Sequence, residues 1–242
     1  MSEPGSLIRA LSGRPSARNY HSYVISELGV GIASGRFPIG SILPNETEIM
    51  DSYGVSRTVL REALKTLEAK GLVEARAKVG TRVLPRNRWN LFDRQVLSWI
   101  HEAGPDEAFL ASFFVVRRMI ETEAAAEAAL HRTADQVRML RYWLNQRFAT
   151  TAMPEPHALA EFELHRTICE ASQNPFLRAA TGIVEFGIAR GIMGRVGLFP
   201  EDLAREKAPS YDRLVAAVEA GEAEPAREAM GSLLKLDEMR GI

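Results

Sequence analysis

The stretch Ile42–Val83, ILPNETEIMDSYGVSRTVLREALKTLEAKGLVEARAKVGTRV, contains the local signals that decide the fold of the N-terminal part of the chain. Asn45 stands where it can cap a helix, and Glu48 lies three residues later, which is the spacing of a capping box. Gly54 then allows a tight turn, and Ser56 can cap a second helix. The stretch therefore predicts two capped helices joined by a short turn.

The second predicted helix presents two cations together near its N-terminal end. Arg57 and Arg61 lie one turn apart, beside a face formed by apolar residues at helical spacing. Gly71 ends the helix, and the segments 72–74 and 81–83 are predicted to be the strands of a hairpin. This order of elements indicates a winged helix-turn-helix, which places the start of its second helix in the major groove, where arginine reads guanine. Taken alone, two arginines one turn apart are also typical of a solvated helix face.

The same stretch resembles the DNA-binding domain of the GntR family of bacterial transcription regulators. The matching residues are Leu43, Pro44, Glu46, Val55, Ser56, Arg57, Arg61, Glu62, Ala63, Leu64, Gly71, Leu72 and Gly80. Thr47 departs from the family pattern, which commonly has arginine after the glutamate of the first helix. Arg76, Lys78 and Arg82 make the predicted wing basic, as phosphate contacts require. The partner implied is double-stranded operator DNA, and the candidate DNA-binding residues are Thr47, Ser56, Arg57, Thr58, Arg61, Lys78 and Gly80.

Composition limits the class of protein. With 242 residues, 46% of them hydrophobic, the chain is large enough for two domains with proper cores. Its single cysteine, Cys169, excludes an intramolecular disulfide and suits a reducing cytoplasm. No apolar run is long enough to span a membrane and the N-terminus lacks a signal-peptide core, so we expect a cytoplasmic protein with no membrane partner.

Charge is distributed unevenly along the chain. Residues 1–88 contain 13 Lys and Arg against 8 Asp and Glu, whereas the remaining residues contain 17 against 23. The basic half is the half with the helix-turn-helix, as expected where affinity depends partly on phosphate contacts. We expect a flexible N-terminal arm at 1–18, a winged helix-turn-helix domain at 19–85 that begins with a helix at 20–34, a linker at 86–104 with a helix at 89–101, and an all-α ligand-binding and dimerisation domain at 105–242.

The C-terminal half shows helical spacing and no strand pattern. Its predicted helices are at 106–131, 133–149, 156–172, 175–194, 200–220 and 222–239. Helices of this length predict an all-α domain with a bundle-like core, so the fold class is mainly α. This half resembles the FCD ligand-binding domain of the FadR subfamily of GntR regulators at Arg117–Glu121, Glu161–His165, Asn174–Pro175 and Ala216–Met230. The segment 86–100 is similar to the linker of sugar-acid regulators in this family.

Polar residues interrupt the apolar faces of three predicted helices in this half. Glu161 and His165 lie on the core-facing side of one helix, and Arg117 and Tyr211 hold similar positions on two others. Burying a charge is expensive unless it is paired, so two interpretations stand. In one, Arg117 pairs with Glu121 or Glu161, and His165 bonds a backbone carbonyl. In the other, Arg117, Glu161, His165 and Tyr211 line a polar cavity in which a guanidinium selects a small organic acid as effector.

Many relatives in the family carry a metal in this domain, held by an aspartate, a histidine four residues later and two further histidines. The corresponding residues here are Glu161, His165, Tyr211 and Leu233, so the ligand set that the resemblance implies is incomplete. Glu161 and His165 remain weak candidates for a divalent metal, and we expect no tightly held metal or other cofactor. His157 lies in the first turn of its helix and is expected to be exposed. The other histidines, His21, His101 and His131, are interpreted as surface or interdomain residues.

The sequence thus predicts a homodimeric, ligand-responsive transcription regulator that represses genes for a carboxylate or sugar-acid pathway. Dimerisation is expected because one winged helix reads only a few base pairs, whereas two related by a twofold axis read a palindrome. Two alternatives stay open. One is a helical metal-assisted hydrolase that uses Glu161 and His165 as base and acid, and the other is an architectural DNA-binding protein without an effector.

Overall fold

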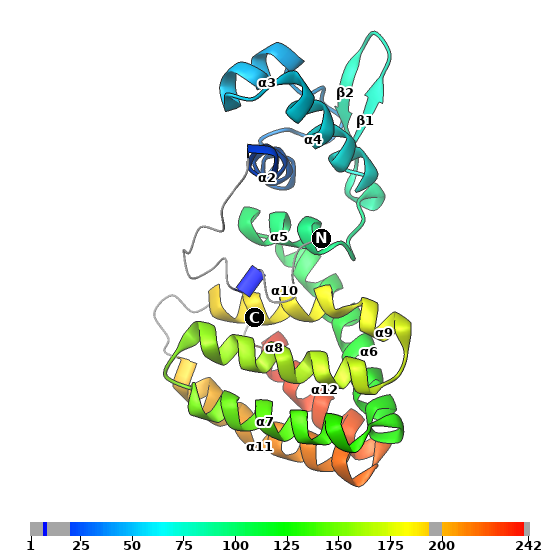
Figure 1. Cartoon of the computed structure of the whole chain (residues 1–242), viewed down its shortest axis with the longest axis vertical. Helices are drawn as coiled ribbons and strands as arrows, with labels where there is room; N and C mark the ends of the chain where they lie inside the picture. The colour runs from blue at the N-terminus through cyan, green and yellow to red at the C-terminus, as the bar shows by residue number, and fades with distance from the viewer. Residues whose placement is uncertain (1–6, 9–19, 194–199, 240–242) are drawn as a thin grey trace. The chain divides into compact units, whose positions relative to one another are not determined.

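A computed structural model describes residues 7–8, 20–193 and 200–239 of the chain (Figure 1). The chain divides into two compact units, one spanning Pro15–Pro105 and the other combining Met1–Arg14 with Asp106–Ile242. We call the first the winged unit and the second the helical unit. Within the described residues, no helix is both long enough and apolar enough to cross a membrane.

The winged unit contains the predicted helix-turn-helix and hairpin. Its elements are α2 (Tyr20–Ala33), α3 (Glu46–Tyr53), α4 (Arg57–Ala69), β1 (Val73–Arg76), β2 (Gly80–Val83), the 3-10 turn η1 (Arg86–Arg88) and α5 (Arg94–Ala103). The capping box is formed as predicted, because Asn45 Oδ1 accepts from Glu48 N at 3.0 Å and Glu48 Oε2 accepts from Asn45 N at 3.2 Å. Gly54 has a φ of 64°, which a glycine adopts without strain, and Ser56 Oγ accepts from Val59 N at 3.4 Å to begin α4.

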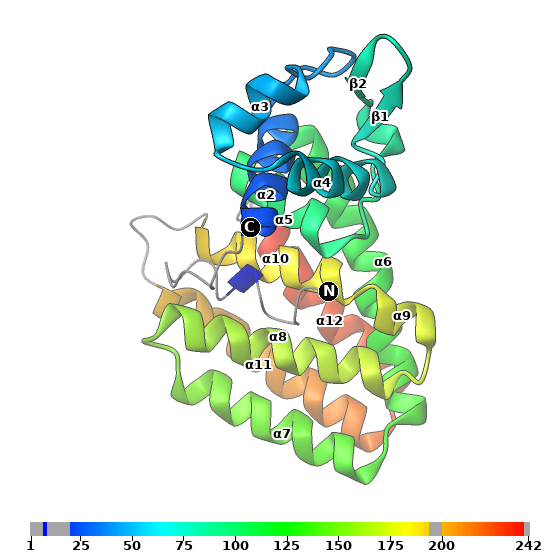
Figure 2. The same ribbon diagram turned by 45° about the horizontal axis from the view of Figure 1, so that its top comes forward.

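The hairpin that forms the wing is a two-stranded antiparallel sheet in which Val73 pairs with Val83 and Arg76 with Gly80. Lys78 lies at its tip with a φ of 64°. In Figure 2 the hairpin lies beside the C-terminal end of α4, which leads directly into β1. Val73 and Val83 are buried, so one end of the sheet closes the core of the winged unit while its tip extends into solvent.

Helix α5 differs from its prediction at both ends. It begins at Arg94 rather than Trp89, because Asp93 Oδ1 accepts from the backbone N–H groups of Gln95 and Val96 and so caps it. It packs on α2, where a Cβ at Gly29 would lie 2.3 Å from Cδ2 of Trp99. The segment expected to be a linker helix is therefore packed into the winged unit. His101, expected at the surface or between domains, is buried.

The helical unit is all α in its described residues. Its helices are α6 (Glu107–His131), α7 (Ala134–Ala149), α8 (Pro154–Ala171), α9 (Pro175–Ala179), α10 (Thr181–Met193), α11 (Pro200–Ala220) and α12 (Ala223–Met239). These match the predicted helices, except that the one expected at 175–194 is divided at Ala180 into α9 and α10. Figure 2 shows α7 lying alongside both α8 and α11. The alanines of α6 at 124–126, 128 and 129 are buried and let α8 and α12 pack closely against it.

The expected arm at residues 1–18 lies outside the described residues except for Leu7 and Ile8. These two residues are buried and belong to the apolar core of the helical unit. The backbone N–H of Leu7 donates to Oε1 of Glu185 on α10 at 2.7 Å. At these two positions the chain packs into the helical unit.

Candidate nucleic-acid interface and buried ion-pair centre

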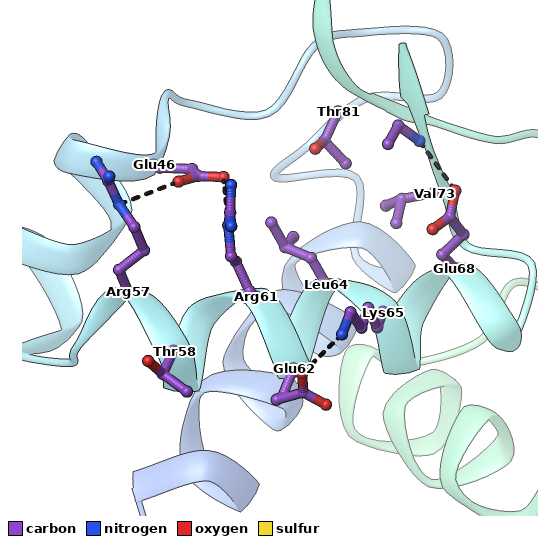
Figure 3. A pocket seen from close by; sticks show the side chains of 11 residues that line it. Glu46, Arg57, Thr58, Arg61, Glu62, Leu64, Lys65, Glu68, Val73 and Thr81 are labelled. Carbon is purple, nitrogen blue, oxygen red and sulfur yellow. Dashed lines mark hydrogen bonds and ion pairs between the residues drawn. The ribbon is translucent and has the colours of Figure 1, made fainter. Parts of the chain in front are cut away.

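The exposed face of α4 carries the two arginines that the sequence singled out. The side chains of Arg57 and Arg61 are 65% and 64% exposed. Figure 3 shows both pointing from α4 toward Glu46, while Thr58 and Glu62 point away from them. Glu46 is the first residue of α3, and its carboxylate lies 3.5 Å from Nε of Arg57 and 3.8 Å from Nε of Arg61. One carboxylate therefore forms ion pairs with both guanidinium groups, at a surface that is open to solvent.

A groove of about 530 Å³ runs between this face of α4 and the wing. It is lined by the two arginines and Glu46 at one end and by Val73 and Thr81 of the wing at the other. Oε1 of Glu68 on α4 accepts from the backbone N–H of Ala75 at 3.1 Å, a bond that fastens β1 to the helix. The wing is thus held at a set distance from the arginines, as joint contact with one DNA surface requires.

All seven predicted DNA-binding residues are exposed in the structure: Thr47, Ser56, Arg57, Thr58, Arg61, Lys78 and Gly80. Gly80 has a φ of 115°, and a Cβ there would lie 2.9 Å from Cγ2 of Ile42, so this position of the wing favours glycine. In the sequence, Glu46 is marked only by its match to the family pattern. Glu46 lies in the first turn of α3 and faces the start of α4 across a tight turn. This position could have indicated that it pairs with the arginines of α4.

The helical unit contains a second cluster, which is buried and rich in charged side chains and which we call the ion-pair centre. It brings together nine buried side chains from α6, α7, α8, α11 and α12: Arg117, Glu121, Arg147, His157, Glu161, His165, Lys207, Tyr211 and Asp237. Three of them are carboxylates and three are fixed cations, so their formal charges balance when the histidines are neutral. Such balance is the condition under which buried charges are tolerated.

Arg117 connects one half of the centre. Its Nε lies 2.5 Å from Oε1 of Glu121, and its Nη1 lies 3.0 Å from Oδ2 of Asp237. The other oxygen of Glu121 accepts from Nδ1 of His165, whose Nε2 lies 2.8 Å from the hydroxyl of Tyr211. Arg117 thus pairs with Glu121, one of its two predicted partners, and not with Glu161. The expected backbone-carbonyl partner of His165 is wrong, since its ring bonds a carboxylate and a phenol.

Glu161 connects the other half. Its Oε1 accepts from Nζ of Lys207 at 3.0 Å, and its Oε2 accepts from Nε of Arg147 at 3.2 Å. The guanidinium of Arg147 also stacks over the ring of Tyr211, with Cζ 4.0 Å from the ring centroid. His157 was expected to be exposed, which is wrong, because it is buried and its Nδ1 donates to the carbonyl of Arg147 at 2.9 Å. The start of α8 is covered by the end of α7, so a first-turn residue is not solvated there.

Burial and the neighbouring cations act in opposite directions on the carboxyl pKa values. Burial alone would raise the pKa of Glu121, but Arg117 and His165 outweigh it and lower that pKa to about 2. Burial likewise opposes ionisation of Glu161, yet Lys207 and Arg147 hold its pKa well below the usual range. Burial raises the pKa of Tyr211 well above its ordinary value, so its phenol stays protonated. Burial also lowers the pKa of His157, which favours its neutral ring.

The four residues predicted to line an effector site are brought together as the sequence indicated, but three members of the centre were missed. Each missed residue continues a buried helical stripe. Arg147 follows Leu140 by seven residues, Asp237 follows Met230 by seven, and Lys207 precedes Tyr211 by four. Applying the same helical spacing to every charged residue, and not only to those in motifs, would have identified them.

The weak metal candidates do not fit a metal. Both oxygens of Glu161 are engaged by Lys207 and Arg147, and both ring nitrogens of His165 are engaged by Glu121 and Tyr211. In the described part of the chain, no three His, Cys, Asp or Glu side chains converge so that they could hold an ion. Leu233, at the position of the fourth family ligand, is buried in the apolar core. These oxygens and nitrogens are therefore occupied by hydrogen bonds with neighbouring side chains and are not free to bind a metal.

Comparison with known proteins shows the family of the chain. Residues 22–83 match the family model described as bacterial regulatory proteins, gntR family, and residues 112–236 match that of the FCD domain, which spans more than half of the chain. The chain belongs to the GntR family. It is a DNA-binding transcription regulator with a winged helix-turn-helix and a C-terminal effector-binding FCD domain, which places it among regulators and not among enzymes.

Two similar relatives in Escherichia coli are named as regulators. The uncharacterized HTH-type transcriptional regulator YieP is 37% identical over 67% of this GntR chain and 72% of that protein. The galactonate operon transcriptional repressor is 30% identical over 76% of this chain and 82% of that protein. The solved structure of Lar from Listeria monocytogenes matches with a TM-score of 0.67 at 17% identity, covering 93% of this chain and 98% of that one, which shows the common fold. The hydrolase alternative finds no support among these relatives.

Proposed function

We propose that this regulator is a homodimeric repressor that binds a palindromic operator and is released from it by a small carboxylate effector. Its sequence specificity is inferred from the exposed pair Arg57 and Arg61 at the start of α4, beside the wing. An arginine that bonds O6 and N7 of guanine together contributes about 1–3 kcal/mol of discrimination against a wrong base. Two such arginines one turn apart suit neighbouring base pairs of one half-site.

The other exposed polar residues suit backbone contacts. Ser56 and Thr58 flank Arg57 at the start of α4, where backbone N–H groups and hydroxyls can meet a phosphate. Thr47 on α3 offers a neutral hydroxyl where the family commonly has a cation. Lys78 and Gly80 lie at the wing tip, where a lysine can meet a phosphate and a glycine lets the backbone approach closely.

The effector class follows from two unsatisfied donors in the ion-pair centre. Among the described residues, the buried Nη2 atoms of Arg117 and Arg147 have no hydrogen-bond partner. A buried donor without an acceptor is costly, and a carboxylate is the acceptor that a guanidinium selects. Glu161, His165 and Tyr211, the other predicted contacts, belong to the same bonded centre.

A sugar acid suits this centre because it combines one carboxylate with several hydroxyl groups. The hydroxyls can exchange hydrogen bonds with side chains that both donate and accept, such as Tyr211 and His165. Relatives named for the galactonate and Uxu operons support the same class, and relatives named as repressors support repression as the direction of control. If the effector favours a spacing of the two winged units that mismatches the half-sites, its binding must weaken DNA affinity by reciprocity.

The test is a selection of random duplexes on the purified protein, followed by anisotropy titrations with the selected sequence. After exhaustive chelation, a panel of sugar acids is compared with the matching uncharged polyols, which keep the hydroxyls and lack the carboxylate. We expect a palindromic consensus, and one or more acids that weaken binding while their polyols do not. Selection without a consensus would refute sequence-specific recognition. A polyol as effective as its acid would refute the carboxylate assignment.

A further inference from the structure

Two carboxylates from different helices meet on a single ammonium group in the ion-pair centre. Nζ of Lys207 on α11 lies 3.0 Å from Oε1 of Glu161 on α8 and also forms an ion pair with Oδ1 of Asp237 on α12. The three side chains are 4%, 8% and 4% exposed. A buried ammonium between two buried carboxylates therefore ties three helices together.

We propose that Lys207 is a built-in counter-cation, which gives the FCD domain of this chain the charge compensation that a divalent metal supplies in relatives. Lysine suits this role because its ammonium is a compact charge with three donors, and it can bridge acceptors from different directions. Metal ions bind carboxylates by the same attraction, so a fixed cation and a metal compete for the same oxygens.

The charge balance of the centre supports this assignment. Arg117, Arg147 and Lys207 match Glu121, Glu161 and Asp237, so an added divalent ion would leave two positive charges uncompensated in a buried region. A metal would therefore have to expel Lys207 from between the two carboxylates. The family resemblance implies a metal in this domain, but the residues of this chain do not fit one. The structural cause is Lys207, a lysine on the inner face of α11.

Removing the ammonium while keeping the volume tests the proposal. In Lys207→Met, Glu161 and Asp237 each keep one arginine but face each other without the shared cation. We expect the melting temperature to fall by roughly 6 °C or more, as for loss of one partner of a buried pair in a domain of this size. Adding Mn²⁺ or Zn²⁺ should then restore part of the loss, with saturation, because two buried carboxylates have become available to it.

Lys235→Met is the matched control, since Lys235 lies on α12 two residues before Asp237 but is exposed. It should leave the melting temperature nearly unchanged and give no response to metal. The unmodified chain should be insensitive both to chelation and to added Mn²⁺ or Zn²⁺, and native mass spectrometry should find it free of bound metal. Lys207→Arg keeps the charge and should also show no metal response, which provides a readout even if Lys207→Met does not fold.

Three results would overturn the proposal. They are a stoichiometric metal retained by the unmodified chain, a melting temperature of that chain that falls on chelation, and a Lys207→Met variant that behaves like Lys235→Met. Neither DNA nor an effector enters these measurements, so failure here is distinguishable from failure of the proposed repressor function. If the centre needs no metal, any effector should also weaken DNA binding equally well in chelated buffer.

Discussion

Glu46→Gln is the substitution that most directly tests how the DNA-binding surface is organised. The change removes a charge and keeps the side chain's size, at a carboxylate 3.5 Å and 3.8 Å from the two recognition arginines. Each attraction amounts to about 1 kcal/mol at water's dielectric constant. All three side chains are more than a third exposed, so the folded state should lose no more than about 1 kcal/mol.

The effect on DNA binding should be larger than the effect on stability. In the free protein the two guanidinium groups are attracted to Glu46, and that attraction must be weakened or shared before they can contact a phosphate or a base. Without it, affinity for a random-sequence duplex should rise about threefold to tenfold at low salt, since about 1.4 kcal/mol corresponds to a factor of ten. Discrimination between the selected operator and random DNA should fall, because the arginines are no longer held in one orientation.

Asp51→Asn provides the matched control for this measurement. It removes the same charge from the same helix, and Asp51 is exposed with no ion pair among the described residues. Fluorescence anisotropy on one random duplex at two salt concentrations compares the variants directly. If Glu46→Gln binds random DNA no more tightly than Asp51→Asn does, the reasoning that Glu46 restrains Arg57 and Arg61 is refuted.

Three further predictions concern the two units separately. Arg57→Ala should cost about 1–3 kcal/mol on the selected operator and relax the preference at one base position of each half-site, as a repeated selection would show. Gly29→Ala places a Cβ 2.3 Å from Trp99 and should destabilise α2 in hydrogen exchange, whereas in a Trp99→Leu background the same change should be neutral or stabilising; additive effects would contradict the packing. Ile8→Ala, which removes a side chain with no exposed surface, should lower the stability of the helical unit by about 2 kcal/mol or more in denaturant titrations, and an unchanged midpoint would mean that this anchor contributes nothing.

Local chemistry explains why the winged unit could be predicted from the sequence. The capping box of Asn45 and Glu48, the turn at Gly54 and the cap at Ser56 are interactions between residues at most four positions apart. Such signals are complete within the stretch that contains them. The start of α5 was mispredicted although its cap is equally local, because the apolar residues that precede Asp93 continue the spacing of the helix and conceal its true first turn.

The ion-pair centre could be predicted only in part, because its contacts join residues far apart in the sequence. Periodicity showed that Arg117 and His165 face the core, but it does not say which charges from other helices they meet. The pairing of Arg117 with Asp237 spans 120 residues, and that of Lys207 with Glu161 spans 46. The partner of a buried charge is decided by helix packing, which the spacing within one helix does not contain.

The closed arrangement of the centre constrains how an acid can act on this regulator. Each carboxylate of the centre is already bonded to at least one cation. The cations are thus already paired, and their net electrostatic attraction for an incoming carboxylate is small. What it can gain are the two Nη2 donors of Arg117 and Arg147, which lie on α6 and α7. An acid that satisfies both donors would connect these two helices and draw Arg147 away from Glu161 or Tyr211. The effector should therefore act by redistributing bonds within the centre rather than by supplying missing charge, and hydrogen exchange at the ends of α7 and α8 should change when it binds.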